Sequence, residues 1–148
     1  MYCIGIISKD IELINSISKY GKTIILNKEN IKKHLEENWD ILLIEDILDN
    51  KYIEILGNNS KYIIINDLLE LDIRLNRNVN IITYGFNYKS TVTVSSNSEE
   101  NLVICIQRAI NGIHGKEIEQ QEIIIQNDKE KEANQKIIEK IIQEILEK

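Results

Sequence analysis

The feature that most constrains the fold is a series of short apolar runs, each about the length of one β-strand. The runs are rich in isoleucine and apolar at consecutive positions, so both faces of each strand need a cover. Segments with helical spacing lie between them. The runs are Tyr2–Ser8, Thr23–Leu26, Asp40–Ile44, Tyr62–Ile65 and Asn80–Tyr84. Strands that alternate with helices in this way predict an α/β fold with a small Rossmann-like parallel sheet.

Helices are expected between these strands. Apolar residues recur at helical spacing in Ile11–Ile17, and Gly21 is expected to stop that helix. Asn30 is a residue type that caps helices, which favours a helix from Ile31 to about Asn38. A short helix is expected over Ile47–Leu56, and a helical turn or two over Leu68–Leu75.

The pattern changes after Gly85. Thr91–Val94 alternates polar and apolar residues, as an edge or antiparallel strand does. The spacing predicts a helix that begins at Glu99 and has an apolar face of Leu102, Val103, Ile106 and Ile110, with Gly112 or Gly115 at its end. Glu117–Ile125 is expected to be a last extended segment. The fold class therefore includes an antiparallel extension of the sheet.

The C-terminal segment predicts an amphipathic helix that is separate from the rest. We divide the chain into an α/β domain over residues 1–126 and a charged helix over 127–148, helical from Asp128. An apolar stripe follows one face of the helix: Ile137, Ile138, Ile141, Ile142, Ile145 and Leu146. An isolated helix of this length is marginal in water, so the stripe must pack on its own domain, on a second copy or on another protein.

Composition narrows the classes of partner. The chain has 148 residues, enough for one domain with a sizeable core, and a formal net charge of -6. Lysine and arginine are interspersed with acidic residues, so we expect neither nucleic acid nor an anionic membrane as a partner. The sequence lacks an apolar stretch of about 18 residues, and its first run is too short for a signal peptide. A cytoplasmic protein is therefore expected.

No cofactor or metal is expected from the motifs. Cys3 and Cys105 lie inside apolar runs, which favours small buried hydrophobic side chains. His34 and His114 lack partners at metal-ligand spacing. The sequence has no glycine-rich dinucleotide fingerprint. Gly21-Lys22-Thr23 precedes a strand and lacks the first glycine of a P-loop, so it is interpreted as a turn.

One segment, about Lys61–Ser96, resembles the terminal part of the central ATPase domain of Mur ligases. It carries a strand ending in Asn66-Asp67, a following strand ending in the Tyr84-Gly85-Phe86-Asn87 corner, and an alternating strand. The YGFN and IQR segments also resemble small clostridial proteins. The resemblance implies a Mur-ligase-like fold. It does not extend to the activity, because a P-loop, a carboxylated lysine, magnesium ligands and a C-terminal domain are all missing.

Polar side chains gather where the predicted parallel strands end. The carboxyl ends of parallel strands share one edge, where ligands of α/β proteins bind. The candidate ligand-binding residues are Asp10, Asp46, Asn66, Asp67, Tyr84 and Asn87. A solvated rim is the alternative. A receiver-like fold would place an acceptor at Asp46, but the acidic pair and the lysine that phosphotransfer needs are absent. A degenerate receiver-like scaffold remains a remote alternative.

The absence of a complete catalytic motif predicts a protein that is not an enzyme. We expect a binding or regulatory module that acts through protein contacts, with another protein or as a homodimer through the C-terminal helix. Candidate partner-binding residues are Arg108, Ile138, Ile141 and Ile145. Arg108 could instead form a surface ion pair or reach an acid at the strand ends. The alternative function is a small-ligand or nucleotide-binding domain that uses the strand ends.

Overall fold

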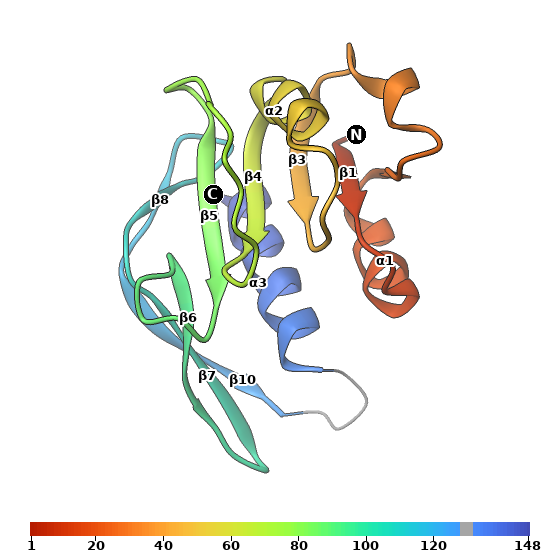
Figure 1. The fold of residues 1–148 in the computed structure, drawn as a ribbon. Helices are drawn as coiled ribbons and strands as arrows, with labels where there is room; N and C mark the ends of the chain where they lie inside the picture. Colours follow the sequence, from red (N-terminus) through yellow and green to blue (C-terminus); the bar gives the residue numbers. More distant parts are fainter. Residues whose placement is uncertain (128–131) are drawn as a thin grey trace. The chain divides into compact units, whose positions relative to one another are not determined.

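The computed structural model describes residues 1–127 and 132–148 of the chain (Figure 1). Its contacts divide the chain into two compact units, Met1–Ile82 and Thr83–Lys148. Strand β5 (Asn80–Gly85) runs across this division and belongs in part to each unit. The predicted division at residue 126 lies inside the second unit.

The first unit contains the predicted parallel sheet. Its strands are β1 (Cys3–Ile7), β2 (Lys22–Ile25), β3 (Trp39–Ile44) and β4 (Ser60–Asn66). Hydrogen bonds order them β2-β1-β3-β4-β5, the strand order of flavodoxin-like folds. The β1–β2, β1–β3 and β3–β4 pairs are parallel, which confirms the predicted α/β class. The order reverses direction between β1 and β3, so this is the point where α/β folds place ligands.

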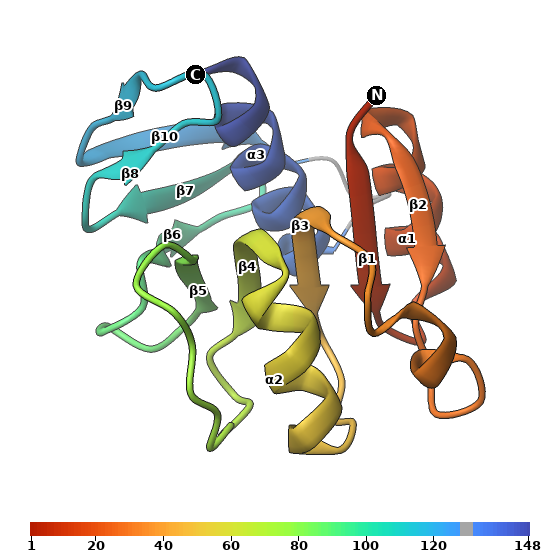
Figure 2. The same ribbon diagram turned by 90° about the horizontal axis from the view of Figure 1, so that it is seen from above.

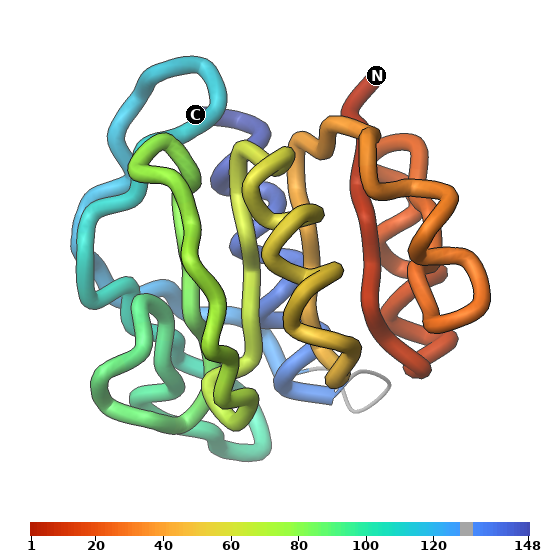
Figure 3. The backbone as a smooth tube through the Cα atoms, turned by 45° about the horizontal axis from the view of Figure 1, so that its top comes forward, coloured from red at the N-terminus to blue at the C-terminus, as the bar shows by residue number. Residues whose placement is uncertain are grey.

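Helices cover the strands because both strand faces are apolar. Helix α1 (Ile11–Ile17), extended by the short 3₁₀ turn η1 (Ser18–Tyr20), lies beside β1 and β2, and α2 (Asn50–Asn58) lies beside β3 and β4 (Figures 2 and 3). One core joins β-strands, α2 and the 3₁₀ turn η2 (Ile31–His34). Its buried members are Ile7, Leu26, Ile31, Trp39, Leu42, Ile44, Ile53, Leu56, Ile63 and Ile65. Within this unit, burial raises the pKa of the Tyr62 phenol above its ordinary value, because burial disfavours the charged phenolate.

Two helices predicted for this unit differ in the structure. The predicted helix over Ile31–Asn38 is the 3₁₀ turn η2, and the Asn30 side chain makes no capping bond to it. The helix predicted to begin at Ile47 begins at Asn50, because the Asp49 carboxylate accepts a hydrogen bond from the backbone N–H of Lys51 and so caps it there.

The helical turn predicted over Leu68–Leu75 is wrong. Residues 69–76 form no helix, and their apolar side chains fall at every second position, as in an extended segment. Those side chains pack against the core beside α2: Leu69, Leu71, Ile73 and Leu75. The α2 side chains of Glu54 and Asn58 hydrogen-bond the backbone of Arg74 and Asn76, which holds the segment in place.

The second unit contains the predicted antiparallel extension. Hydrogen bonds order its strands β5-β6-β7-β10, with β6 at Val92–Asn97, β7 at Asn101–Ile106 and β10 at Gln121–Gln126. The β6–β7 and β7–β10 pairs are antiparallel. Strand β6 is therefore an interior strand of this order. A separate two-stranded hairpin joins β8 (Ile110–Asn111) to β9 (Glu117–Ile118).

The helix predicted from Glu99 to Ile110 is wrong, because this segment contains strand β7. Leu102, Ile104 and Ile106 are buried, and the residues between them are only partly buried. Apolar residues at consecutive positions suit a helix face or a strand covered on both faces equally well. The pairing with β6 and β10 decides between the two in this chain.

The predicted C-terminal helix is confirmed as α3 (Ala133–Glu147). The prediction began this helix at Asp128, and residues 128–131 lie outside the described part of the chain. Ile141 of α3 lines a small apolar gap together with Val92 and Ile104 of the unit's own sheet. The β8–β9 hairpin donates backbone hydrogen bonds to the last turn of α3, from Ile113 to Ile145 and from Lys116 to Lys148. In residues 1–127 and 132–148, no helix combines the length and apolarity that crossing a bilayer requires.

Candidate functional site

The connection from β5 to β6 is unusually short for the pairing that it makes. The two strands pair in parallel, Tyr84 with Val92 and Gly85 with Thr93, yet only residues 86–91 join them. Parallel neighbours usually need about a dozen residues of crossover. Gly85 has a φ of 145°, a conformation that side chains disfavour, which is why glycine stands at this corner. We call residues 86–91 the aromatic loop.

Two side chains from the end of β7 hold the backbone of the aromatic loop. The Gln107 amide donates hydrogen bonds to the carbonyl oxygens of Tyr88 and Ser90, at 2.7 and 2.6 Å. The Arg108 guanidinium donates to the carbonyl of Lys89 at 3.0 Å and to the Thr91 hydroxyl at 3.1 Å. These bonds tie three consecutive carbonyls and the end of the loop to one neighbouring strand.

The base and the tip of the loop carry further hydrogen bonds. Thr83 and Thr91 are joined by a bond from the Thr91 N–H to the Thr83 hydroxyl at 2.9 Å, with the two hydroxyls 3.3 Å apart. At the tip, the Asn87 side chain accepts from the Lys89 N–H at 2.9 Å, and the Ser90 N–H donates to the Asn87 carbonyl at 3.0 Å. The Asn87 side-chain oxygen thus shapes its own turn, as asparagine commonly does.

The loop presents two aromatic side chains to solvent. Phe86 is 68% exposed and Tyr88 is 76% exposed. The Lys89 ammonium lies 5.8 Å from the centre of the Tyr88 ring, within cation–π range. The loop therefore combines apolar area, a positive charge and a backbone that is held in one shape. Exposed aromatic side chains are enriched at protein interfaces relative to the rest of the surface.

The polar residues predicted at the strand ends of the first unit mostly bond to their own loops. The Asp10 carboxylate caps α1 by accepting from the Leu13 N–H at 3.2 Å. Asp46 accepts from the Ile47 N–H at 2.9 Å, and Asn66 accepts from the Leu68 N–H at 2.9 Å. Asp67 follows Asn66 in the same turn.

One ion pair links the loops that follow β1 and β3. The Lys9 ammonium lies 3.7 Å from the Asp46 carboxylate, which places these two loops side by side at the point where the strand order reverses. Lys9 is 92% exposed, so the pair contributes little to stability. The pair shows that the loop after β1 and the loop after β3 lie next to each other.

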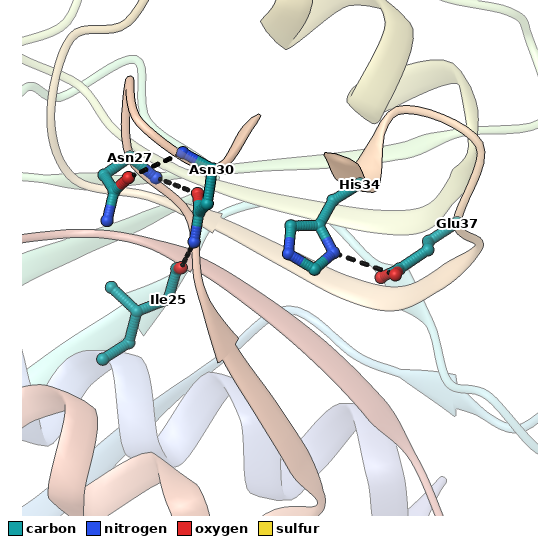
Figure 4. A network of polar contacts seen from close by, with 5 residues as sticks. All are labelled: Ile25, Asn27, Asn30, His34 and Glu37. Atoms are coloured by element: carbon teal, nitrogen blue, oxygen red, sulfur yellow. Dashed lines mark hydrogen bonds and ion pairs between the residues drawn. The ribbon is translucent and has the colours of Figure 1, made fainter. Parts of the chain in front are cut away.

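A concave surface lies next to this point, and none of its lining residues is among the predicted site residues. We call it the strand-end crevice. Its lining combines a lysine, an aspartate and a tyrosine with three aliphatic side chains: Lys28, Ile31, Ile47, Leu48, Asp49 and Tyr52. Lys28 sits in a turn that Asn27 and Asn30 fix by reciprocal side-chain bonds, while the Asn30 amide also donates to the Ile25 carbonyl (Figure 4). The nearby His34 ring lies 2.8 Å from Glu37 and lines no part of this surface.

The remaining predicted site residues lie in the second unit. Tyr84 is fully buried on β5, and Asn87 shapes the aromatic loop. Ile138, Ile141 and Ile145 are buried within the single chain. Contact of these three isoleucines with a partner would need α3 to move away from its present packing. Arg108 lies just after β7 rather than on a helix, and it is bonded to the aromatic loop.

The sequence predicted no role for Gln107 and no exposure of the Phe86 and Tyr88 side chains. Phe86 and Tyr88 flank Asn87 in a segment rich in turn-forming residues, and that placement could have indicated their exposure. Nothing local to Gln107 indicates its role. The described residues contain no group of three or more histidine, cysteine, aspartate or glutamate side chains placed to hold a metal ion. Cys3 and Cys105 are free thiols, each partly buried.

Comparison with known proteins gives no relative from which to transfer a function. No family model, no curated protein and no solved structure matches the chain. The resemblance to Mur ligases therefore stays a prediction from the residues alone. Any function must be argued from the geometry of the two units.

Proposed function

We propose that the protein is a non-catalytic binding module that contacts another protein through the aromatic loop. The observation that carries this proposal is the exposure of Phe86 and Tyr88 on a backbone that Gln107 and Arg108 hold. Aromatic side chains supply much of the energy of protein interfaces. A loop that is already held in one shape loses less conformational entropy on binding.

The chemistry of the loop defines the partner surface that would fit it. Phe86 needs an apolar pocket, because it has no polar atom to satisfy. The Tyr88 ring and the Lys89 ammonium suit a rim that offers a hydrogen-bond acceptor or a carboxylate. The whole chain carries a net charge of -6, so Lys89 and Arg108 form a local exception that favours an acidic rim.

Site-specific photo-crosslinking tests this proposal in the cells that make the protein. A photoreactive phenylalanine analogue replaces Tyr88, and in a control it replaces Ile11, which is 71% exposed on the other unit. We expect a crosslinked product of discrete mass from position 88 and none from position 11. The Phe86→Ala substitution should abolish that product. Absence of a discrete product, or equal products from both positions, would contradict the proposal.

A second candidate function is small-ligand binding in the strand-end crevice. It is favoured by one observation, a concave lining of mixed chemistry beside the reversal of the strand order. Lys28 would bind an anionic group such as a phosphate, and Ile47 and Leu48 would cover an apolar part of the ligand. Nucleotides and sugar nucleotides combine both features.

A thermal-shift screen discriminates between the two functions. Nucleotides, sugar nucleotides and divalent cations are tested at millimolar concentration, because a ligand that binds the native state raises the melting temperature by mass action. A shift that disappears in Lys28→Ala and persists in Lys9→Ala would assign the ligand to the crevice. No shift with any of these compounds would remove this candidate.

A further inference from the structure

Within the described part of the chain, strand β10 pairs with another strand on one edge alone, and Glu122 is its single charged side chain. It is the terminal strand in the hydrogen-bonded order, paired on one side with β7. Exposed edges are normally blunted by charged side chains, especially lysine, by proline, by a bulge or by short length. The strand has six residues, Gln-Glu-Ile-Ile-Ile-Gln, with neither lysine nor proline, and its register with β7 is regular. Ile124 at its centre is 70% exposed.

The register identifies which backbone groups point outward from this edge. The Asn127 N–H donates to the Glu100 carbonyl at 2.8 Å, in line with the register in which Gln126 lies opposite Asn101. Bonding alternates along an antiparallel ladder, so Gln121, Ile123 and Ile125 bond to β7. The backbone groups of Glu122, Ile124 and Gln126 are directed to the outer edge, and no hydrogen bond within the described residues occupies them.

We propose that this edge pairs with the same edge of a second copy, in antiparallel orientation about a two-fold axis at Ile124. Residues that direct their backbone groups outward must face one another, which sets Ile124 opposite the Ile124 of the second copy. In the same register Glu122 faces Gln126 of the other copy, twice by symmetry. On the opposite face Ile123 lies opposite Ile125.

The side chains make this register self-complementary. A Gln126 amide donates to a Glu122 carboxylate at each end, while the two Ile124 side chains pack at the centre. A register centred on Glu122 would instead set two carboxylates opposite each other, which is unfavourable. One centred on Gln126 would leave most of the strand unpaired. The pairing at Ile124 is the one register in which all three outward-directed residues, Glu122, Ile124 and Gln126, face one another, and it separates the like charges.

Sedimentation equilibrium over micromolar to millimolar concentration tests the pairing. We expect the mass to rise from 17.2 kDa toward twice that value. Ile124→Lys should leave a monomer throughout the range, because it places two ammonium groups opposite each other. Ile11→Lys, a substitution at a residue 71% exposed in the first unit, should leave the dimer unchanged. A wild-type chain that stays at 17.2 kDa, or an Ile124→Lys chain that still dimerises, would overturn the proposal.

Two substitutions at one position test the register itself. Gln126→Lys sets an ammonium opposite each Glu122 and should tighten the dimer, whereas Gln126→Glu sets two carboxylates together and should weaken it, each by roughly two- to thirty-fold. Equal effects from the two changes would reject this register.

Amide exchange of the wild-type chain gives an independent readout that requires no variant. The amide protons of Glu122, Ile124 and Gln126 should become protected as concentration rises. Those of Gln121, Ile123 and Ile125, already bonded to β7, should change little. Unchanged exchange at the first three positions would overturn the proposal even if an association were seen by mass.

Discussion

The polar side chains at the strand ends of the first unit and the side chain of Gln107 in the second unit act over different distances along the chain. In the first unit, Asp10, Asp46 and Asn66 each bond a backbone N–H that follows within three residues. In the second, Gln107 bonds carbonyls that precede it by 19 and 17 positions. A local bond fixes the shape of one turn. A long-range bond fixes where a turn lies relative to another strand, which is what a contact loop requires.

The largest expected effect concerns the packing of α3, where Ile141 lies beside Val92 and Ile104, residues far from it along the chain. Ile141→Ala removes a side chain that is 4% exposed and that lines a small apolar gap together with Val92 and Ile104. We expect a loss of about 2–5 kcal/mol in the free energy of unfolding, measured by urea titration with circular dichroism.

The matched control replaces an isoleucine on the surface of the same unit. Ile124→Ala should change the free energy of unfolding by no more than about 0.5 kcal/mol at low protein concentration. A cost below about 1 kcal/mol for Ile141→Ala would mean that α3 is not part of the core of this unit.

The next effect concerns the corner where the aromatic loop begins. Gly85→Ala forces a side chain onto a backbone with a φ of 145°, and we expect it to cost about 1–3 kcal/mol. The same variant should shift the amide resonances of residues 86–91 in an NMR spectrum. A neutral effect on both measurements would show that the loop can form without the glycine conformation.

The same contrast explains how far the sequence alone could predict this molecule. In the first unit, apolar runs and helix spacing within about 20 residues suffice to predict β1, α1, β3 and β4, because parallel strands buried on both faces are continuously apolar. The prediction of a helical turn or two over Leu68–Leu75 is wrong, although the sequence of residues 69–76 has a period-two pattern. Attention to that pattern would have corrected it.

The second unit depends on pairings that no local pattern records. The pattern of Leu102–Ile106 suits a helix face equally well, and its pairing with β6 and the distant β10 makes it a strand. The hydrogen bonds from Gln107 to the aromatic loop could not be predicted either, because the sequence around a glutamine does not indicate which carbonyl its side chain will bind. At the strand ends of the first unit, the sequence identifies Asp10, Asp46 and Asn66 as polar residues. That their side chains bond backbone N–H groups of their own caps and turns depends on the backbone geometry, which the sequence does not show.

The hydrogen bonds that Gln107 donates to the aromatic loop can be tested by removing its side-chain amide. Gln107→Ala leaves the carbonyls of Tyr88 and Ser90 to water, which we expect to cost about 1–2 kcal/mol, since each such bond contributes roughly 0.5–1.5 kcal/mol net. The amide protons of the aromatic loop should exchange about tenfold faster. Gln121→Ala is the control, because its side chain bonds only the nearby Glu119 carbonyl. Equal effects from both variants would mean that the loop holds its shape unaided.

The smallest expected effect concerns a local bond, the cap that Asp10 provides for α1. Asp10→Ala removes the carboxylate that caps α1, so we expect a loss of about 1 kcal/mol in the free energy of unfolding. Asp10→Asn keeps a side-chain oxygen in the same place and should restore most of that loss. Amide exchange should accelerate at Leu13 in the alanine variant and stay unchanged in the aromatic loop. If the loop responded to Asp10→Ala as strongly as to Gln107→Ala, the strand-end polar residues of the first unit would have an influence beyond their own turns, and the distinction between local and long-range bonds would fail.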